Sequence, residues 1–150
     1  MESFVMNDRT SSPSTFFSVL PLDWRESILP VWPEYKDSTK VLTIEKQRSI
    51  IAGGLVFSKP TPDTFMYLSV AENLFNKGFL YLAYIWVVEQ HRGKGLGLLW
   101  LNELIKKYPE QKFWLAIEEF ELHHFYEKCG FILKDEITLS SGSEWIMTRD

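Results

Sequence analysis

Residues 80–101 constrain the fold more than any other stretch of the sequence. They begin with nine apolar or aromatic residues that carry no charge, at positions 80–88. This composition predicts a β-strand that is buried on both faces. A short turn follows, with glycines at 93, 95 and 97 and with the basic residues Arg92 and Lys94. The apolar residues after the turn predict the start of a helix.

A glycine-rich turn between a strand and a helix is suited to bind phosphate. The first N–H groups of a helix lack partners within the helix and point toward an anion, which the helix dipole also favours. Glycine allows the backbone to approach the anion closely and to adopt positive φ. The spacing excludes a P-loop, because position 88 is Val. It also excludes the dinucleotide-binding pattern, because Gly97 comes one residue too early.

Two motifs identify a family that this sequence resembles. The turn, Arg92-Gly-Lys-Gly-Leu-Gly97, matches the pattern Arg/Gln-x-x-Gly-x-Gly/Ala. Further along, the run Phe125-Tyr-Glu-Lys-Cys-Gly-Phe131 places its tyrosine 29 residues after Gly97. These runs resemble the acyl-CoA pyrophosphate loop and the Phe-Tyr-x-x-x-Gly-Phe signature of the GCN5-related N-acetyltransferase (GNAT) family. The resemblance covers residues 80–131, and elsewhere it depends on the order of the elements.

The resemblance implies that acetyl-CoA is the cosubstrate and that the turn holds its pyrophosphate. The positions matching the family's cofactor contacts are Trp86, Val87, Val88, Arg92, Gly93, Lys94, Gly95, Leu96 and Gly97. The implied activity is transfer of an acetyl group from the thioester directly to a primary amine, on a small molecule or a peptide. Two alternatives stay open: a non-catalytic acyl-CoA-binding or sensor module, and an enzyme that acetylates protein N-termini or lysines.

Acyl transfer needs an oxyanion donor, a proton donor for the thiolate and a neutral attacking amine. The resemblance implies a backbone N–H near Val87 or Val88 as the oxyanion donor. It implies Tyr126 as the proton donor, although a tyrosine that only packs between helix and sheet would look the same. Candidate bases are Glu118 and Glu119, between a predicted strand and a predicted helix. Either could instead be a solvated or capping carboxylate, and a chain of water molecules could replace both.

Other residues give weaker indications. The adjacent histidines at 123 and 124, with the single cysteine Cys129, do not have the spacing of a zinc site, so we expect no metal. The resembled family forms one wall of its acceptor groove from two helices near the N-terminus. The matching residues, which could also be ordinary core and surface positions, are Trp24, Trp32, Glu34 and Tyr35. Many relatives carry Asn seven residues before the tyrosine, where this chain has Glu119.

Bulk properties narrow the class of protein. A length of 150 residues suits a single N-acetyltransferase domain over 1–150, with the polar residues 1–14 as a loose tail. The net charge of −4 argues against a nucleic-acid partner. We also expect a cytoplasmic protein that does not interact with membranes, since a single cysteine cannot form an internal disulfide and no apolar run has the length of a membrane span. A homodimer is one assembly that it could form.

The order of the elements predicts an α+β fold with a mixed α/β sheet. The expected strands are 15–20, 40–45, 49–58, 80–88, 112–117, 131–133 and 144–148, and the expected helices are 22–29, 64–77, 95–108 and 119–128, with a short helix or loop at 31–35. Gly53 and Gly54 suggest a bulge or a close backbone approach within the third of these strands. This order fits a GNAT-like sheet of about six to seven strands with helices on both faces, and the resemblance implies that the two central strands splay apart.

Overall fold

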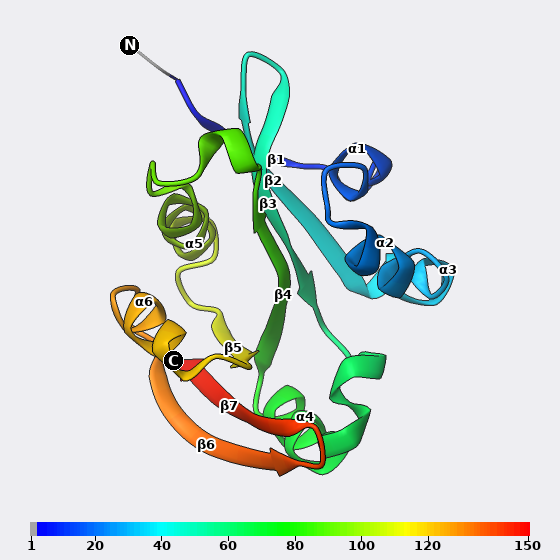
Figure 1. Cartoon of the computed structure of the whole chain (residues 1–150), viewed down its shortest axis with the longest axis vertical. Coiled ribbons are helices and arrows are strands. Elements are labelled where there is room, and N and C mark those ends of the chain that lie inside the picture. Colours follow the sequence, from blue (N-terminus) through cyan, green and yellow to red (C-terminus); the bar gives the residue numbers. More distant parts are fainter. Residues whose placement is uncertain (1–2) are drawn as a thin grey trace. The chain divides into compact units, whose positions relative to one another are not determined.

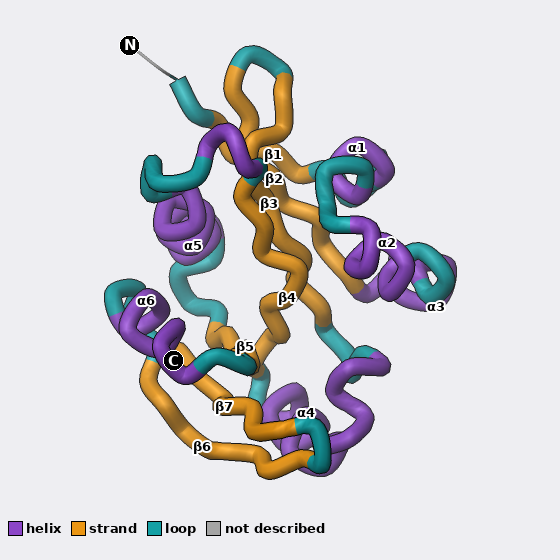
Figure 2. The backbone as a smooth tube through the Cα atoms, viewed as in Figure 1, coloured by secondary structure: helices purple, strands orange, loops and turns teal. Residues whose placement is uncertain are grey.

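The computed structural model describes residues 3–150 (Figures 1 and 2). These residues form two compact units. Among the described residues, the first unit holds 3–57 and 83–107, and the second holds 58–82 and 108–150. Strand β4 (Phe79–Val87) contributes to both. The strand order is β1-β2-β3-β4 in the first unit and β4-β5-β7-β6 in the second. With β4 and β5 parallel and the other recorded pairs antiparallel, this confirms the predicted mixed sheet.

The first unit is an antiparallel ladder with helices on both faces (Figure 1). Its strands are β1 (Val5–Asp8), β2 (Thr39–Lys46) and β3 (Ser49–Phe57), followed by the end of β4. Three short helices lie on one face: α1 (Ser14–Phe17), α2 (Leu22–Ile28) and α3 (Trp32–Tyr35). The longer helix α5 (Leu96–Lys107) lies on the other face. The turn between β2 and β3 has positive φ at Gln47 and Arg48, which suits a tight hairpin.

The two glycines of β3 allow side chains to pack directly on the strand. A Cβ added to Gly53 would lie 2.5 Å from the Phe16 ring of α1. A Cβ added to Gly54 would lie 2.6 Å from the Trp100 ring of α5. The Trp100 indole N–H also donates to the Leu42 carbonyl at 3.0 Å, so the ring is fixed in place. The sequence predicted a bulge or a close backbone approach at these glycines. The structure instead places a side chain against each of them, one from each face, and the register shift of the β2–β3 pair lies between Ile44 and Glu45.

The N-terminal segment differs from the prediction in two places. Val5–Asp8 forms an edge strand paired with β2, where a loose tail was expected over 1–14. The polar pattern hid this strand, because pairing with a preformed neighbour can override weak local propensity. Met1 and Glu2, at the start of the expected tail, lie outside the described residues. The strand expected over 15–20 is instead helix α1, because a short apolar run does not distinguish a strand from a buried helix.

The second unit pairs a short stretch of β4 with three further strands. These are β5 (Lys112–Ile117), β6 (Ile132–Leu139) and β7 (Gly142–Arg149). The recorded β4–β5 pairing runs from Phe79↔Lys112 to Tyr81↔Trp114. Helix α4 (Leu68–Asn76) covers one face, where Phe75 contacts Trp114 at 5.8 Å between ring centroids. Arg149 Nε of β7 donates to the Cys129 carbonyl just after helix α6 (His123–Glu127).

Several boundaries in the second unit depart from prediction. The helix expected over 64–77 begins as a 3-10 segment, η2 (Pro62–Tyr67), before α4. The helix expected over 119–128 also opens with a 3-10 turn, η4 (Phe120–Leu122), and ends as predicted at Gly130, whose φ is 87°. Its capping bonds run from Gly130 to Glu127 and from Phe131 to Tyr126, the pattern of a Schellman motif. The closing hairpin of β6 and β7 is longer than predicted.

Strand β4 is not buried along its whole length. Its first residues are buried, apart from Leu80, but all five from Ala83 to Val87 are partly exposed. The prediction of a strand buried on both faces is therefore wrong for its C-terminal half. An apolar run shows that a strand can be buried, but it does not show whether neighbouring elements cover one face of the strand or both. This partly open half belongs to the first unit and leads directly into the glycine-rich turn.

Candidate active site

The turn between β4 and α5 has the backbone that its glycines predict. Gly93 has φ of 79° and Gly95 has φ of 75°, in the region that side chains with a Cβ rarely adopt. A Cβ added at either position would have no atom within 4 Å, so there is room for a side chain. Glycine is required at these positions because of the backbone conformation. Residues 92–95 are all exposed, and an anion can approach them.

The first turn of α5 presents N–H groups beside this loop. Leu99 donates to the Gly95 carbonyl at 3.0 Å, so the N–H groups of Leu96, Gly97 and Leu98 precede it at the positive end of the helix. Leu96 is 2% exposed, and its buried side chain anchors the helix start. A twelve-residue helix with two lysines in its last turn has the dipole orientation that favours an anion here.

The basic residues of the turn are held near the end of β4. The Arg92 guanidinium lies 4.5 Å from the centroid of the Trp86 ring, and its Nε donates to the Val87 carbonyl at 3.2 Å. Lys94 Nζ lies 3.3 Å from His91 Nδ1 in η3 (Glu89–His91). The turn, its two cations and the last residues of β4 thus form one continuous surface within the first unit.

The two candidate oxyanion donors differ in their hydrogen bonding. The Val88 N–H donates to the Ile51 carbonyl of β3 at 2.9 Å, so it is engaged within the protein and is not a suitable donor. Successive N–H groups of an extended chain point to opposite edges, which directs the Val87 N–H away from β3. Of the two positions predicted, Val87 is the one whose geometry suits the role.

Helix α2 packs against the partly exposed half of β4. The Trp24 ring meets Trp86 at 5.2 Å and Tyr84 at 5.8 Å between centroids, and Ser27 Oγ lies 2.7 Å from Tyr84 Oη. Tyr84 has φ of 56°, which is strained for a residue with a Cβ and interrupts the alternation of the strand. Of the predicted acceptor contacts, only Trp24 joins this aromatic group.

The other predicted acceptor contacts lie elsewhere in the first unit. Trp32 packs edge-on against Phe17 at 5.0 Å, and the buried Tyr35 packs against Phe57 at 6.0 Å. Glu34 is exposed in the short helix α3. The rings of Trp32 and Tyr35 pack against other aromatic side chains, and Glu34 is a surface residue. These are the ordinary core and surface roles that the sequence left open as the alternative.

Tyr126 lies in helix α6 of the second unit, held by aromatic neighbours. Its ring is edge-on to Phe125 at 5.0 Å and to Phe131 at 6.0 Å. Burial, with a smaller contribution from Cys129, raises the pKa of Tyr126 to about 12. Its phenol is therefore protonated at neutral pH, as a proton donor must be.

The two candidate bases have different surroundings. Both Glu118 and Glu119 are exposed in the segment after β5, and the Glu119 carbonyl accepts from Leu122 N–H at the start of η4. Glu118 lies near a group that sequence reasoning missed, which we call the carboxylate–tyrosine cluster. Its members are Asp63, Tyr67, Tyr81, Glu118 and Glu144.

Hydrogen bonds and like charges define this cluster. Tyr81 Oη donates to Asp63 Oδ2 at 2.6 Å, and Tyr67 Oη donates to Glu144 Oε1 at 3.2 Å. Burial raises the pKa of Glu144, the Tyr67 hydrogen bond opposes this shift, and the charges of Glu118 and Asp63 raise the pKa further. Glu118, in the segment after β5, was already a candidate base, but the other members come from η2, β4 and β7, and no local sequence signal could have brought them together with it.

Comparisons with known proteins identify the family and the fold. A profile of the acetyltransferase (GNAT) family matches residues 9–131. No curated protein matches the chain by sequence. The structure of a GNAT family acetyltransferase from Elizabethkingia anophelis with acetyl-CoA bound is similar, with 14% identity, a TM-score of 0.63, and coverage of 98% of this chain and 97% of that one.

Two further structures show the same fold. An acyl-CoA N-acyltransferase from Pseudomonas aeruginosa has 13% identity and a TM-score of 0.60, with all of both chains covered. Aminoglycoside acetyltransferase AAC(6')-Ib in complex with coenzyme A has 16% identity and a TM-score of 0.66, covering 98% of this chain and 94% of that one. Within residues 3–150, no helix combines the length and the apolar character needed to cross a membrane.

Proposed function

Because the chain belongs to the acetyltransferase (GNAT) family, an acyl-CoA N-acyltransferase family, we propose that it transfers an acetyl group from acetyl-CoA directly to a primary amine. The observation that carries this proposal is the exposed 92–97 turn, with positive φ at Gly93 and Gly95, at the start of α5. Backbone N–H groups and two cations beside a helix start form a site for pyrophosphate. The chain is thereby proposed to act as one N-acetyltransferase domain over residues 1–150.

The proposed cofactor contacts follow the motif and its geometry. The pyrophosphate is bound by the backbone from Gly93 to Gly97, with Leu96 anchoring the helix, and by the charges of Arg92 and Lys94. The pantetheine arm lies along the last residues of β4, Trp86 and Val87, and along Val88 after them. Two structural neighbours support this choice of cosubstrate, because one has acetyl-CoA bound and the other has coenzyme A bound.

Each chemical step is assigned to a group of this chain. The neutral amine attacks the thioester carbonyl, and the Val87 N–H stabilises the oxyanion that develops. The carbon–sulfur bond then breaks, and Tyr126 gives its proton to the leaving thiolate. The reaction forms no covalent intermediate with the enzyme and requires no metal ion. The assignment of Tyr126 comes from the Phe-Tyr-x-x-x-Gly-Phe match, supported by its protonated state.

We assign proton removal from the amine to a glutamate. The sequence offers Glu118 and Glu119, and the carboxylate–tyrosine cluster favours Glu118 together with Glu144. Burial raises the pKa of the Glu144 carboxyl, and a carboxylate with a raised pKa is a more effective base than a solvated one. Three neighbouring carboxylates, Asp63, Glu118 and Glu144, also favour a cationic acceptor.

The acceptor is proposed to be a small-molecule amine. Two structural neighbours are structures of an aminoglycoside acetyltransferase, one of them in complex with ribostamycin and coenzyme A. A peptide amine, at a protein N-terminus or a lysine, is the alternative acceptor. The proposed location is the cytoplasm, where the buried Cys129 thiol is expected to stay reduced.

The first experiment tests the turn by calorimetric titration with acetyl-CoA and with CoA. We compare the wild type with Gly95→Glu, and with Gly142→Glu as a matched control. Gly142 also has positive φ, at 132°, and open space at its Cβ, but it is the first residue of β7. We expect micromolar binding that Gly95→Glu abolishes and Gly142→Glu retains. No binding to the wild type would refute the proposal.

A second experiment separates an enzyme from a sensor. Free thiol is measured while the protein is mixed with acetyl-CoA and a panel of amines, including aminoglycosides and short peptides. An acetyltransferase releases CoA in proportion to the acetylated amine. A chain that binds acetyl-CoA and releases no thiol with any amine would be a binding module instead.

A further inference from the structure

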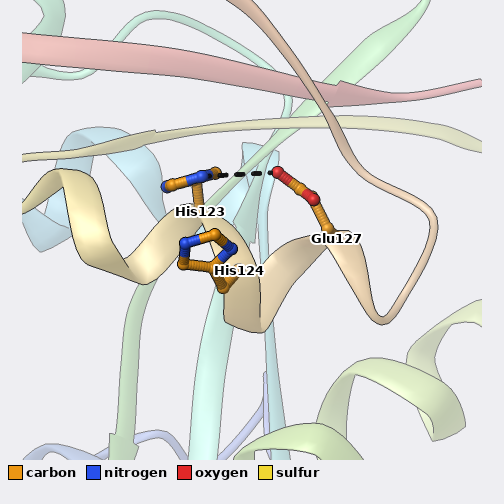
Figure 3. A group of neighbouring side chains, drawn as sticks. All are labelled: His123, His124 and Glu127. Atoms are coloured by element: carbon orange, nitrogen blue, oxygen red, sulfur yellow. Dashed lines mark ion pairs between the residues drawn. The ribbon is translucent and has the colours of Figure 1, made fainter.

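Two histidines and a glutamate gather on helix α6. The side chains of His123, His124 and Glu127 each offer one ligand atom, and these atoms all lie within 4.8 Å of one another (Figure 3). The sequence argued against a metal because the histidines and Cys129 lack zinc spacing. The structure adds a different third ligand, since Glu127 lies one helical turn after His123 and on the same side.

The orientation of His123 makes its outer nitrogen available. Its Nδ1 lies within hydrogen-bonding distance of the Phe120 carbonyl, and a carbonyl can only accept, so Nδ1 carries the proton. In the neutral ring Nε2 then has the lone pair, and this atom lies 3.6 Å from Glu127 Oε1. Histidines that bind metals commonly donate their other N–H to a carbonyl in this way.

The distances suit a small ion. Ligand atoms around a tetrahedral zinc lie roughly 3.3 Å apart, given bonds of about 2.0 to 2.1 Å. The Nε2–Oε1 distance of 3.6 Å is already close to that value. The Glu127 side chain is 50% exposed and His124 is exposed, so an ion can enter from solvent without opening the helix.

We propose that His123, His124 and Glu127 bind a divalent transition-metal ion, with Zn²⁺ as the best match. Two imidazoles and one carboxylate are ligands that zinc accepts, and a fourth position would be filled by water. The ion takes no part in acyl transfer, and the proposal does not depend on the activity. Its effect is mechanical: it links residues one turn apart in a helix of five residues that also carries Tyr126.

Calorimetric titration with Zn²⁺ tests this on the full chain, without a polyhistidine tag and in a buffer that does not chelate metals. We expect one ion per chain, with affinity at least about tenfold weaker in His124→Gln and in Glu127→Gln. The third histidine supplies the control: His91 lies in η3 of the other unit, so His91→Gln should bind like the wild type.

Thermal unfolding gives an independent measurement. Binding to the folded state alone should raise the melting temperature by on the order of 5 °C at a hundredfold excess of Zn²⁺ over Kd. His124→Gln and Glu127→Gln should lose this rise while melting like the wild type without metal. Equal zinc binding by the wild type and His124→Gln, or loss of binding in His91→Gln, would overturn the proposal.

Discussion

The guanidinium of Arg92 lies over the ring of Trp86, 4.5 Å from its centroid, and donates to the carbonyl of the neighbouring Val87. This arrangement holds a cation of the proposed phosphate-binding turn against the end of β4. It connects the two parts of the proposed cofactor site, because one side chain contacts both.

Trp86→Ala is expected to weaken acetyl-CoA binding by about two- to fivefold, because an exposed cation–π contact contributes roughly 0.5–1 kcal/mol. Trp86→Phe keeps a ring beneath Arg92 and should retain most of the affinity. Calorimetric titration measures both, and melting temperatures report any loss of packing against Trp24. Equal weakening by Phe and Ala would show that the ring face is not what matters.

Tyr126→Phe is expected to lower kcat by about 10²- to 10⁴-fold, since it removes only the proposed proton donor. The KM for acetyl-CoA and its Kd should stay near the wild-type values, because the hydroxyl is proposed to act on the thiolate, which forms only during the reaction. Steady-state thiol release measures kcat and KM. Tyr108→Phe, which removes a hydroxyl after the end of α5, is the control. If Tyr126→Phe kept the wild-type kcat, Tyr126 would have only a packing role.

Glu144 gives a pH dependence whose sign follows from its raised pKa. Folding disfavours the ionised carboxylate, so stability is lost as pH rises from the unfolded pKa, about 4.3, through the higher folded pKa. Glu144→Gln removes this loss, and its melting temperature should change less across the window above pH 4.3 than that of the wild type. Thermal unfolding from pH 4 to 8 measures this, with the exposed Glu110→Gln as the control.

Arg9 and Glu45 predict the opposite pH behaviour. Arg9 donates two hydrogen bonds to the Glu45 carboxylate, at 2.6 and 2.7 Å, which lowers the pKa of Glu45 despite its burial. The stability contributed by this carboxylate is therefore present above the unfolded pKa of about 4.3 and is lost as pH falls through the folded pKa.

Arg9→Met is accordingly expected to destabilise the protein at pH 7, because it leaves a buried carboxylate without its guanidinium. Adding Glu45→Gln should recover part of the melting temperature, since the neutral amide can still accept from the Thr43 hydroxyl. Thermal unfolding of the single and double variants tests this. A double variant less stable than Arg9→Met would show that Glu45 is tolerated without its partner.

The sequence predicted the parts of the fold whose signals are local. The strand, turn and helix around Gly93 and Gly95 were predicted correctly, because positive φ and a helix start each favour particular residue types at a few adjacent positions. The Gly130 cap was found for the same reason. Strand β1 was missed because its residues owe their conformation to pairing with β2, which no local pattern encodes.

In the candidate site, too, only the residues with local sequence signals could be predicted. The 92–97 turn could be identified from its own residues, whereas the pairing of Tyr67 with Glu144 joins positions 77 residues apart. Likewise, the sequence could not choose between Val87 and Val88, because the choice depends on a hydrogen bond to Ile51 in another strand. The i and i+4 spacing of His123 and Glu127, two of the proposed metal ligands, is visible in the sequence, but the expectation of no metal considered only the two histidines with Cys129.

The two glycines of β3 restrict the order in which substitutions can accumulate during evolution. Alanine at position 54 would collide with Trp100 and alanine at 53 with Phe16, so either change is expected to be harmful on its own. A smaller ring or aliphatic side chain at 100 or 16 would have to come first, and it would leave a cavity until the glycine changed. Positions 53 and 16, and positions 54 and 100, should therefore vary together among descendants of this chain, each pair through a less stable intermediate.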